Sequence, residues 1–588
     1  MWRGETPKER VMVIRLGGIM KATFQRKLLL GVFALGVAVS AWAEEPRYFA
    51  IRNAHIVPVS GPEIKSGTVV IAKGLIVTVG ENVSIPPEAW VIEGKGLTVY
   101  PGFINALSDL GLGPAAPAGP GPGGGGGGPA RGQLQPVQAV SHGPQDRPAS
   151  TPWLNAADEL KPDDKRIETW RNAGFTSTMA APMIGIFPGQ GAVVNLAGER
   201  EGEMVVAAPS ALIITFQPMR GFGNFPDSLM GVISYVRQVF LDANWYNQSE
   251  SIYHAHPAGL ERPAYDRTEI VVNDTLASGR PVLLPGNTAQ EMHRALMLAR
   301  DVGAHTVIYG GQQGYEDADE LAAAKVPVLV NLKWPEKEKD ADPEAEEPLR
   351  VLRFRDRAPS SPDALQKAGV KFAFYYEGVG VPKDALKNAK KAIDAGLPSD
   401  AALRAFTLNA AEILGVGDRL GSIEPGKIAN LVVTDGDLFN EKTKVKMTFV
   451  DGQRYEVHEP GRPSAPPTVR LTGEWKINLT GPQGLEEATA DLNLTPDGTL
   501  SGSLTGVSCS MLGSMGTVSI REGWVSGNQF NFTLSLTLGG NPIDVIFSGT
   551  LEGEQMKGTA SGGGVSVDFT GSRPSSTPPA VKTDQEVE

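Results

Sequence analysis

The spacing of apolar and polar residues divides the chain into stretches that follow different periods. Residues 48–100 hold short apolar runs separated by turn signals such as Lys73-Gly74, a pattern typical of strands joined by hairpins. From residue 101 to 414, strand-like apolar runs alternate with segments whose apolar residues recur at helical spacing. The strand-like runs are residues 175–181, 281–284, 306–309, 326–332 and 370–376, and the helical segments include residues 289–301 and 384–395. Residues 420–457 return to short strands.

This alternation of strands and helices predicts the overall fold. Over roughly 300 residues it implies a parallel sheet with helices, and such a length suits a closed (β/α)8 barrel of the TIM type. The fold class is therefore α/β, with the barrel over residues 101–414. We expect the short strands on its two flanks, residues 44–100 and 415–458, to pair with each other into one composite β domain.

A second all-β unit follows the barrel region. Residues 459–468 form a Pro-rich linker. Beyond it, residues 469–573 alternate apolar and polar positions, with turn signals such as Gly527-Asn528 and Glu552-Gly553. This pattern predicts a small antiparallel β-barrel or a β-sandwich.

Three segments have compositions that cannot contribute to a core. Residues 113–132 consist of Gly, Pro and Ala with a single Arg, and we expect them to be disordered. Residues 335–348 are a charged insert that we expect to be exposed to solvent. The tail 574–588 is expected to be disordered as well.

The start of the chain has the pattern of an export signal. Basic residues precede an apolar run at residues 28–39, and Ala41 and Ala43 provide the small residues that a signal peptidase needs. We expect residues 1–43 to be a signal peptide, cleaved after Ala43, and the mature protein to be periplasmic or extracellular. A retained anchor is the alternative, and either Met1 or Met20 could be the true start. No later segment is apolar for long enough to cross a membrane.

Charge and cysteine content exclude several classes of function. The formal net charge is −12, and the leader itself is basic, so the mature chain is more acidic still and would repel a nucleic-acid backbone. Cys509 is the only cysteine, which excludes an internal disulfide and a cysteine-based metal cluster. The sequence has no Gly-x-Ser-x-Gly motif, and its glycine run lacks the Lys-Ser/Thr of a phosphate-binding loop.

Three stretches carry a family resemblance. They are residues 99–106 (VYPGFINA), residues 173–178 with 188–194 (AGFTST and PGQGAVV), and residues 407–433 (TLNAAEILGVGDRLGSIEPGKIANLVV). Together they resemble the amidohydrolase superfamily, and most of all its imidazolonepropionase-like exported members. The resemblance covers residues 48–457, and it implies a barrel with a composite β domain built from both flanks.

The resemblance also implies a chemistry and a set of ligands. In the family, zinc or another divalent metal activates a water molecule and polarises a carbonyl group, usually to hydrolyse a non-peptide C–N bond. The ligand pattern is His-x-His after the first barrel strand, two later histidines and a final aspartate. At these positions the sequence holds Leu107, Asp109, Pro285, Gly310 and Glu377. No histidine lies within three positions of the four histidine sites, so a small alignment error would not restore them.

Two interpretations of this loss remain open. In the first, the protein is catalytically degenerate, needs no cofactor and acts as a ligand-binding or partner subunit. In the alternative, it is an active hydrolase with an unconventional centre around Asp109 and Glu377, in a residual pocket that also holds Tyr375 and Tyr376. Two carboxylates can hold a hard cation with water, but two protein ligands rarely suffice.

Partner classes follow from the same observations. We expect a small-molecule ligand, no nucleic acid, and no membrane contact after signal cleavage. The family resemblance implies a homo-oligomer or a pairing with an active paralogue, and residues 469–573 could carry a structural or adhesive role. His254-Ala-His256 copies the spacing of a metal-ligand pair, but it follows a helical stretch, and we expect a loop in which these histidines have a surface or packing role.

Overall fold

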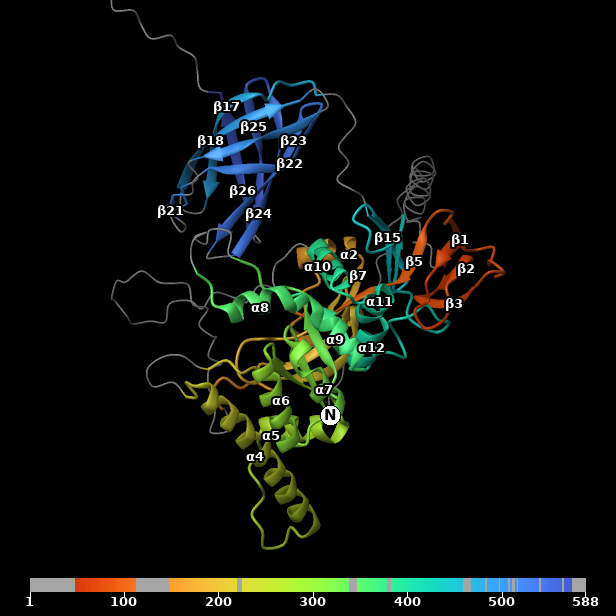
Figure 1. The fold of residues 1–588 in the computed structure, drawn as a ribbon, viewed down its shortest axis with the longest axis vertical. Coiled ribbons are helices and arrows are strands. Elements are labelled where there is room, and N and C mark those ends of the chain that lie inside the picture. Colours follow the sequence, from red (N-terminus) through yellow and green to blue (C-terminus); the bar gives the residue numbers. More distant parts are fainter. Residues whose placement is uncertain are drawn as a thin grey trace, which may run out of the picture.

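A computed structural model describes residues 48–112, 147–218, 225–337, 346–377, 382–457 and 467–573, the last range with several short gaps. The expected leader, the Gly/Pro-rich stretch 113–132 and the tail 574–588 lie outside the described residues. The described strands form two eight-stranded sheets, one closed barrel and a two-stranded ribbon (Figure 1). Within these ranges, no helix combines the length and the apolar character that a membrane crossing requires.

The first sheet joins strands from both flanks of the barrel region, which confirms the expected composite β unit. Its order is β16-β15-β14-β5-β1-β2-β3, with β4 beside β1. The strands are β1 (Tyr48–Ile56), β2 (Ile64–Ala72), β3 (Leu75–Gly80), β4 (Trp90–Glu93), β5 (Thr98–Pro101), β14 (Leu431–Thr434), β15 (Val445–Val450) and β16 (Gln453–Glu456). Strand β14 pairs antiparallel with β5, Val432 opposite Tyr100, so the second flank extends the first.

A buried asparagine fixes this composite sheet to the barrel. The side-chain nitrogen of Asn430 donates to Ser177 Oγ at 2.9 Å and to Asn195 Oδ1 at 2.8 Å, and both acceptors lie on barrel strands. Its side-chain oxygen accepts from the backbone N–H of Asp451 at 2.8 Å. Because a buried amide without partners is costly, these bonds hold the two sheets in one relative position.

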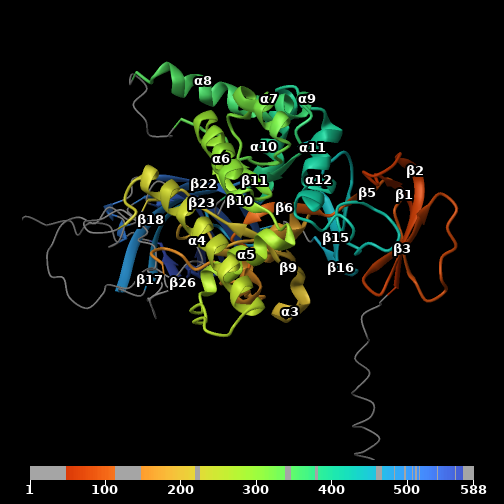
Figure 2. The ribbon, with the colours of Figure 1, turned by 90° about the horizontal axis from the view of Figure 1, so that it is seen from below.

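The second sheet is the α/β barrel, and it confirms the predicted fold class. Its strand order is β13-β12-β11-β10-β9-β8-β7-β6. The strands are β6 (Phe103–Ser108), β7 (Phe175–Ala180), β8 (Gly189–Asn195), β9 (Val205–Ile213), β10 (Val282–Gly286), β11 (Thr306–Gly310), β12 (Val328–Asn331) and β13 (Phe372–Tyr375). The helices are η1 (Ala156–Glu159), α2 (Lys165–Asn172), α3 (Glu201–Met204), α4 (Leu229–Ala255), α5 (Arg267–Ser278), α6 (Ala289–Val302), α7 (Gly314–Ala324), α8 (Leu349–Arg357), η2 (Ala358–Ser360), α9 (Ser361–Lys367), α10 (Pro382–Asp394), α11 (Ser399–Phe406) and α12 (Leu408–Ile413). In Figure 2 the helices α4 to α7 lie outside the barrel strands.

One strand of the barrel contradicts the expected parallel sheet. Strand β8 runs antiparallel to both of its neighbours, β7 and β9, whereas the other adjacent pairs are parallel. The physical reason is the length of the connection. Residues 181–188 join β7 to β8, and a parallel crossover needs about a dozen residues or more.

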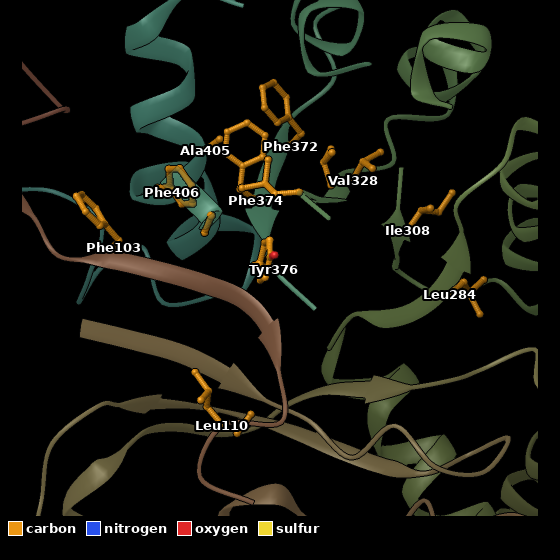
Figure 3. Close-up of a cluster of buried hydrophobic side chains, with 14 of the residues drawn as sticks. Phe103, Leu110, Leu284, Ile308, Val328, Phe372, Phe374, Tyr376, Ala405 and Phe406 are labelled. Atoms are coloured by element: carbon orange, nitrogen blue, oxygen red, sulfur yellow. The ribbon is translucent and has the colours of Figure 1, made fainter. Parts of the chain in front are cut away.

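The barrel strands separate two apolar layers. Ile104, Leu283 and Val307 belong to the cluster that fills the barrel interior. Their neighbours Phe103, Leu284 and Ile308 belong to the larger cluster between the strands and the outer helices, because successive strand residues point to opposite faces. In Figure 3, Phe103, Phe374 and Phe406 gather in this outer layer, and the rings of Phe374 and Phe406 lie 5.1 Å apart edge to face.

The C-terminal unit is a closed antiparallel barrel, which decides between the two predicted alternatives. Its order is β17-β18-β19-β22-β23-β24-β25-β26. The strands are β17 (Gly473–Gly481), β18 (Gly484–Leu494), β19 (Thr499–Thr505), β22 (Val518–Ser526), β23 (Gln529–Leu538), β24 (Asn541–Glu552), β25 (Gln555–Gly562) and β26 (Val565–Ser572), with the ribbon β20 (Ser508–Cys509) and β21 (Gly513–Ser514) between β19 and β22. Phe532 and Phe547 stack at 4.8 Å in the interior. Trp475 donates to Leu471 O at 2.8 Å, and the guanidinium of Arg573 lies over its ring.

The α/β barrel closes through one buried side chain. Asn105 in β6 is 1% exposed, and its Oδ1 accepts from the backbone N–H of Tyr376, just after β13, at 3.1 Å. Its Nδ2 lies 3.5 Å from the carbonyl oxygen of the same residue. The amide thus takes the place of a peptide group between the first and last strands of the barrel.

Replacing Asn105 should therefore loosen the closure. In Asn105→Ala the buried N–H and C=O of Tyr376 lose their partner, which should cost about 2 kcal/mol. We expect hydrogen exchange of the amides in residues 372–377 of the full chain to accelerate about 30-fold, measured by mass spectrometry. Asn247→Ala, on the exposed face of α4, should leave the exchange of this segment unchanged. Equal protection in Asn105→Ala and the unaltered protein would contradict the assignment.

Candidate functional site

The five predicted ligand positions lie at one end of the barrel. Leu107 belongs to β6 and Asp109 follows it, Pro285 and Gly310 lie in the last two residues of β10 and β11, and Glu377 follows β13. These strands run parallel to one another, so their carboxyl ends share one rim. Active sites of such barrels are built at that rim.

Three of the five positions offer no side-chain atom that could bind a metal. Leu107 is buried in the apolar cluster of the barrel interior. Pro285 has a saturated ring without a free lone pair, and Gly310 has no side chain. Zinc in proteins is bound by imidazole, thiolate or carboxylate groups, so these residues do not fit the metal centre of a hydrolase.

The backbone at Gly310 also excludes a larger residue. Its φ is +118°, a conformation that residues with a Cβ rarely adopt. A Cβ built on Gly310 would lie 2.9 Å from the backbone nitrogen and from the Cα of Asn287. The next residue donates its backbone N–H to Gly286 O at 2.8 Å, which holds this close approach in place. A histidine at position 310 would therefore need a shift of the backbone.

Neutral amides occupy the rim instead. Asn287 Nδ2 donates to Gln312 Oε1 at 3.2 Å, and Gln312 Nε2 donates to the backbone oxygen of Asn331 at 3.1 Å. Asn331 Nδ2 in turn donates to Glu377 Oε2 at 3.0 Å. We call these four residues the amide ladder. It connects the carboxyl ends of β10, β11, β12 and β13 in order.

Two tyrosines lie beneath the ladder inside the barrel. Tyr309 donates its hydroxyl to Ile214 O at 3.1 Å, and Tyr375 is buried within the same interior cluster. Burial raises the pKa of both phenols, and the negative charge of Glu377 raises it further. Both side chains are therefore neutral at physiological pH, where they can donate hydrogen bonds but cannot act as anionic nucleophiles.

Asp109 is held by an arginine. Its carboxylate, 53% exposed, lies 2.9 Å from Arg166 Nη1, and Arg166 also bonds the better-buried Asp164, which is 7% exposed. Asp164 caps helix α2 and accepts from the backbone N–H of Gly111 at 3.1 Å. Burial opposes the ionisation of Asp164, but the bonds from Arg166 and from backbone N–H groups outweigh it and hold the pKa of this carboxyl below its ordinary value.

The structure divides the residues of the expected pocket. Tyr375 points into the barrel, whereas Tyr376 belongs to the outer layer, where its ring lies 6.4 Å from that of Trp170. Adjacent strand residues face opposite sides, so the two tyrosines cannot share one pocket. Burial raises the pKa of Tyr376 to about 12. The placement of Tyr376 in the residual pocket was therefore wrong.

No other cluster in the described residues fits a metal ion. Within the described ranges, no group of three or more His, Cys, Asp or Glu side chains converges. His254 lies in the last turn of α4 and pairs with Glu250 at 3.0 Å, and His256 follows as the cap of that helix. The loop expected at His254 was wrong, because α4 continues to Ala255, whereas its expected place at the surface is confirmed by a side chain that is 70% exposed. His142 and His458 lie outside the described residues.

Sequence reasoning missed Asn105 and the three amides of the ladder. Asn287, Gln312 and Asn331 each stand within two residues of the end of a buried apolar strand. A polar amide at that place in successive strand-helix units was the available signal, because carboxyl ends of parallel strands meet at one rim.

Comparisons with known proteins agree with this geometry. A sequence profile of the amidohydrolase family matches residues 286–455. The crystal structure of an amidohydrolase from Thermotoga maritima MSB8 is 26% identical with a TM-score of 0.58, over 69% of this chain and 100% of that one. An N-substituted formamide deformylase from Arthrobacter pascens is 40% identical over 83 residues, which are 13% of this chain and 15% of the length of that relative.

The ion cluster around Arg166 makes stability depend on pH. The lowered pKa of Asp164 stabilises the folded state above the unfolded pKa of about 4, and this contribution is lost as the pH falls through the folded pKa. Asp164→Asn should therefore cost about 2 kcal/mol at pH 7, and the difference from the unaltered protein should shrink below about pH 4. Calorimetric melting from acid to neutral pH measures it. Asp163→Asn, at an exposed neighbour, is the matched control, and a difference that does not vary with pH would refute the ionic account.

Proposed function

Because this chain belongs to the amidohydrolase superfamily, we propose that it is an exported member without a catalytic metal centre, acting as a ligand-binding or partner subunit. The amidohydrolase family typically binds divalent metals such as zinc. The observation that carries the proposal is the backbone at Gly310, whose close approach to Asn287 leaves no room for a ligand side chain.

The amide ladder supports this interpretation. It uses the side chains at the rim to connect strand ends, so they are not left free to converge on a cation. A barrel keeps its fold without a metal when its packed interior and outer helices remain, and both are present here.

The chemistry of the rim suggests the class of ligand. Amides offer donors and acceptors without charge, and Glu377 adds one carboxylate. A small polar molecule that is neutral or cationic would find partners there, whereas an anion would meet Glu377 and the acidic surface of the chain.

Metal analysis tests the proposal directly. We expect mature protein purified without chelators to hold far less than one equivalent of zinc, iron, manganese or nickel by mass spectrometry. Added zinc should not raise the melting temperature, since only a ligand of the folded state stabilises it. The combined variant Leu107→His, Pro285→His and Gly310→His should stay without metal, because a side chain at position 310 collides with the backbone of Asn287. Stoichiometric, tightly held zinc in the unaltered protein would overturn the proposal.

A hydrolytic screen tests the alternative centre. We expect no turnover of cyclic amides, N-substituted formamides or dipeptides. Asp109 pairs with Arg166, and Glu377 bonds Asn331, so neither carboxylate is arranged as a free general base. Turnover that disappears in Asp109→Ala or Glu377→Ala, but persists in Asp163→Ala, would favour the active hydrolase instead.

Export is a separate part of the proposal. The apolar run at residues 28–39 and the small residues Ala41 and Ala43 support cleavage after Ala43. The mature protein should then begin at Glu44 and appear in the periplasm or medium, as N-terminal sequencing would show. In Ala43→Arg the precursor should accumulate uncleaved. An uncleaved native chain would favour the retained anchor.

A further inference from the structure

Helix α4 is the longest helix of the described chain, and only part of it is packed. Its buried residues are Val232, Val236, Val239, Phe240, Ala243 and Tyr246. Beyond Tyr246 the last nine residues of the helix contribute nothing to the core, and in Figure 1 this end projects from the body of the protein.

The face of α4 that points away from the core is apolar. Met230, Leu241, Trp245 and Ile252 are exposed by 78%, 62%, 66% and 60%. At 100° per residue these four side chains lie within an arc of about 60°, and they span about 33 Å of the helix axis. The polar positions within this arc are Ser234 and Gln248, neither of which is charged, and Arg237 and Gln238 lie about 20° beyond its two edges. We call this sector the α4 stripe.

A cavity opens beside the stripe. It has a volume of about 500 Å³ and is lined by α4, α5 and the end of α6, with Phe240, Leu241, Asn244, Leu276 and Val302 among its walls. Leu241 belongs both to the stripe and to the cavity. Single exposed apolar residues are ordinary, but an aligned set that includes a tryptophan next to a cavity is typical of an interaction surface.

We propose that the α4 stripe is the contact surface of a symmetric homodimer, in which α4 packs antiparallel against α4 of a second copy. The twofold axis lies between Leu241 and Trp245. Trp245 of each copy then packs against the cavity beside Leu241 of the other copy. This arrangement is isologous, as in most two-subunit proteins.

The charge of the chain favours a second copy of it as the partner that binds the α4 stripe. Each chain has a net charge of −12, so two copies can pair only through a surface that does not oppose like charges. The stripe meets that condition, and the nearest cation, Arg237, is already bonded to Asp301 at 2.8 Å. A nucleic acid or an anionic membrane would need a basic surface, and the stripe has no basic residue.

The area is sufficient for a stable dimer. The four apolar side chains contribute roughly 500 Å² per copy. A typical interface buries about 800 Å² per partner, of which about 60% is apolar, and the intervening Ser and Gln side chains account for the remainder.

Sedimentation velocity on the full mature chain tests the dimer. The unaltered protein should associate reversibly to a dimer as its concentration rises. Trp245→Glu should weaken the dimer on the order of 30-fold, because a central aromatic residue is lost and a charge is placed in the interface. Trp245→Phe should retain it. Val77→Glu, at a 50% exposed apolar residue of β3, is the matched control and should not affect association. Circular dichroism and melting confirm that each variant is folded.

Cross-linking tests the antiparallel arrangement. In a Cys509→Ser background, a mixture of Leu241→Cys and Trp245→Cys chains should form disulfide-linked mixed dimers in preference to either homodimer. A protein that stays monomeric at every concentration would overturn the proposal, as would a dimer that Trp245→Glu leaves intact or one that prefers Leu241→Cys homodimers. Metal content does not enter this test, so its result is independent of the proposed loss of the metal centre.

Discussion

The carboxyl ends of strands β10 to β13 have to be held together, and in this chain side-chain amides hold them. A metal ion bound from several strand ends would serve two purposes, chemistry and cross-linking. The ladder from Asn287 through Gln312 and Asn331 to Glu377 serves the second purpose with three amides and one carboxylate. Such bonds need no metal ion. This is why the rim can stay ordered under the proposed loss of the metal.

The barrel imposes a second constraint, the alternation of strand side chains. It places Tyr309 and Tyr375 inside, under the ladder, and Tyr376 outside against Trp170. The inner phenols stay protonated because burial and the nearby carboxylate both disfavour the phenolate. The floor of the rim is thus apolar and neutral, with the carboxylate of Glu377 at its edge. That environment favours recognition of a polar molecule over activation of water.

Much of the fold could be predicted from sequence, because the apolar periods and the 407–433 signature are local. The antiparallel β8 could not, since only the short connection at residues 181–188 reveals it. The choice between a barrel and a sandwich for residues 469–573 depends on whether β17 pairs with β26, and both folds have the same alternation. At the site, the residues at the ligand positions could be read directly. The bonds of the ladder could not, because its members come from the ends of four strands whose meeting depends on the closed barrel.

The outer face of helix α4 does not contribute to the core, yet the helix that carries it is held in place. Its middle is anchored by a partly buried ion cluster, in which Arg147 bonds Asp266 at 2.9 Å and Glu269 at 2.6 Å, with Asp242 of α4 at 3.7 Å. Burial and the neighbouring Asp266 raise the pKa of Glu269, so this cluster depends on Arg147 to stay ionised. A helix fixed in this way loses little conformational freedom when its outer face is covered. The anchor therefore favours a preformed contact surface over a flexible arm, and it links Arg147 to the helix that we propose joins two copies.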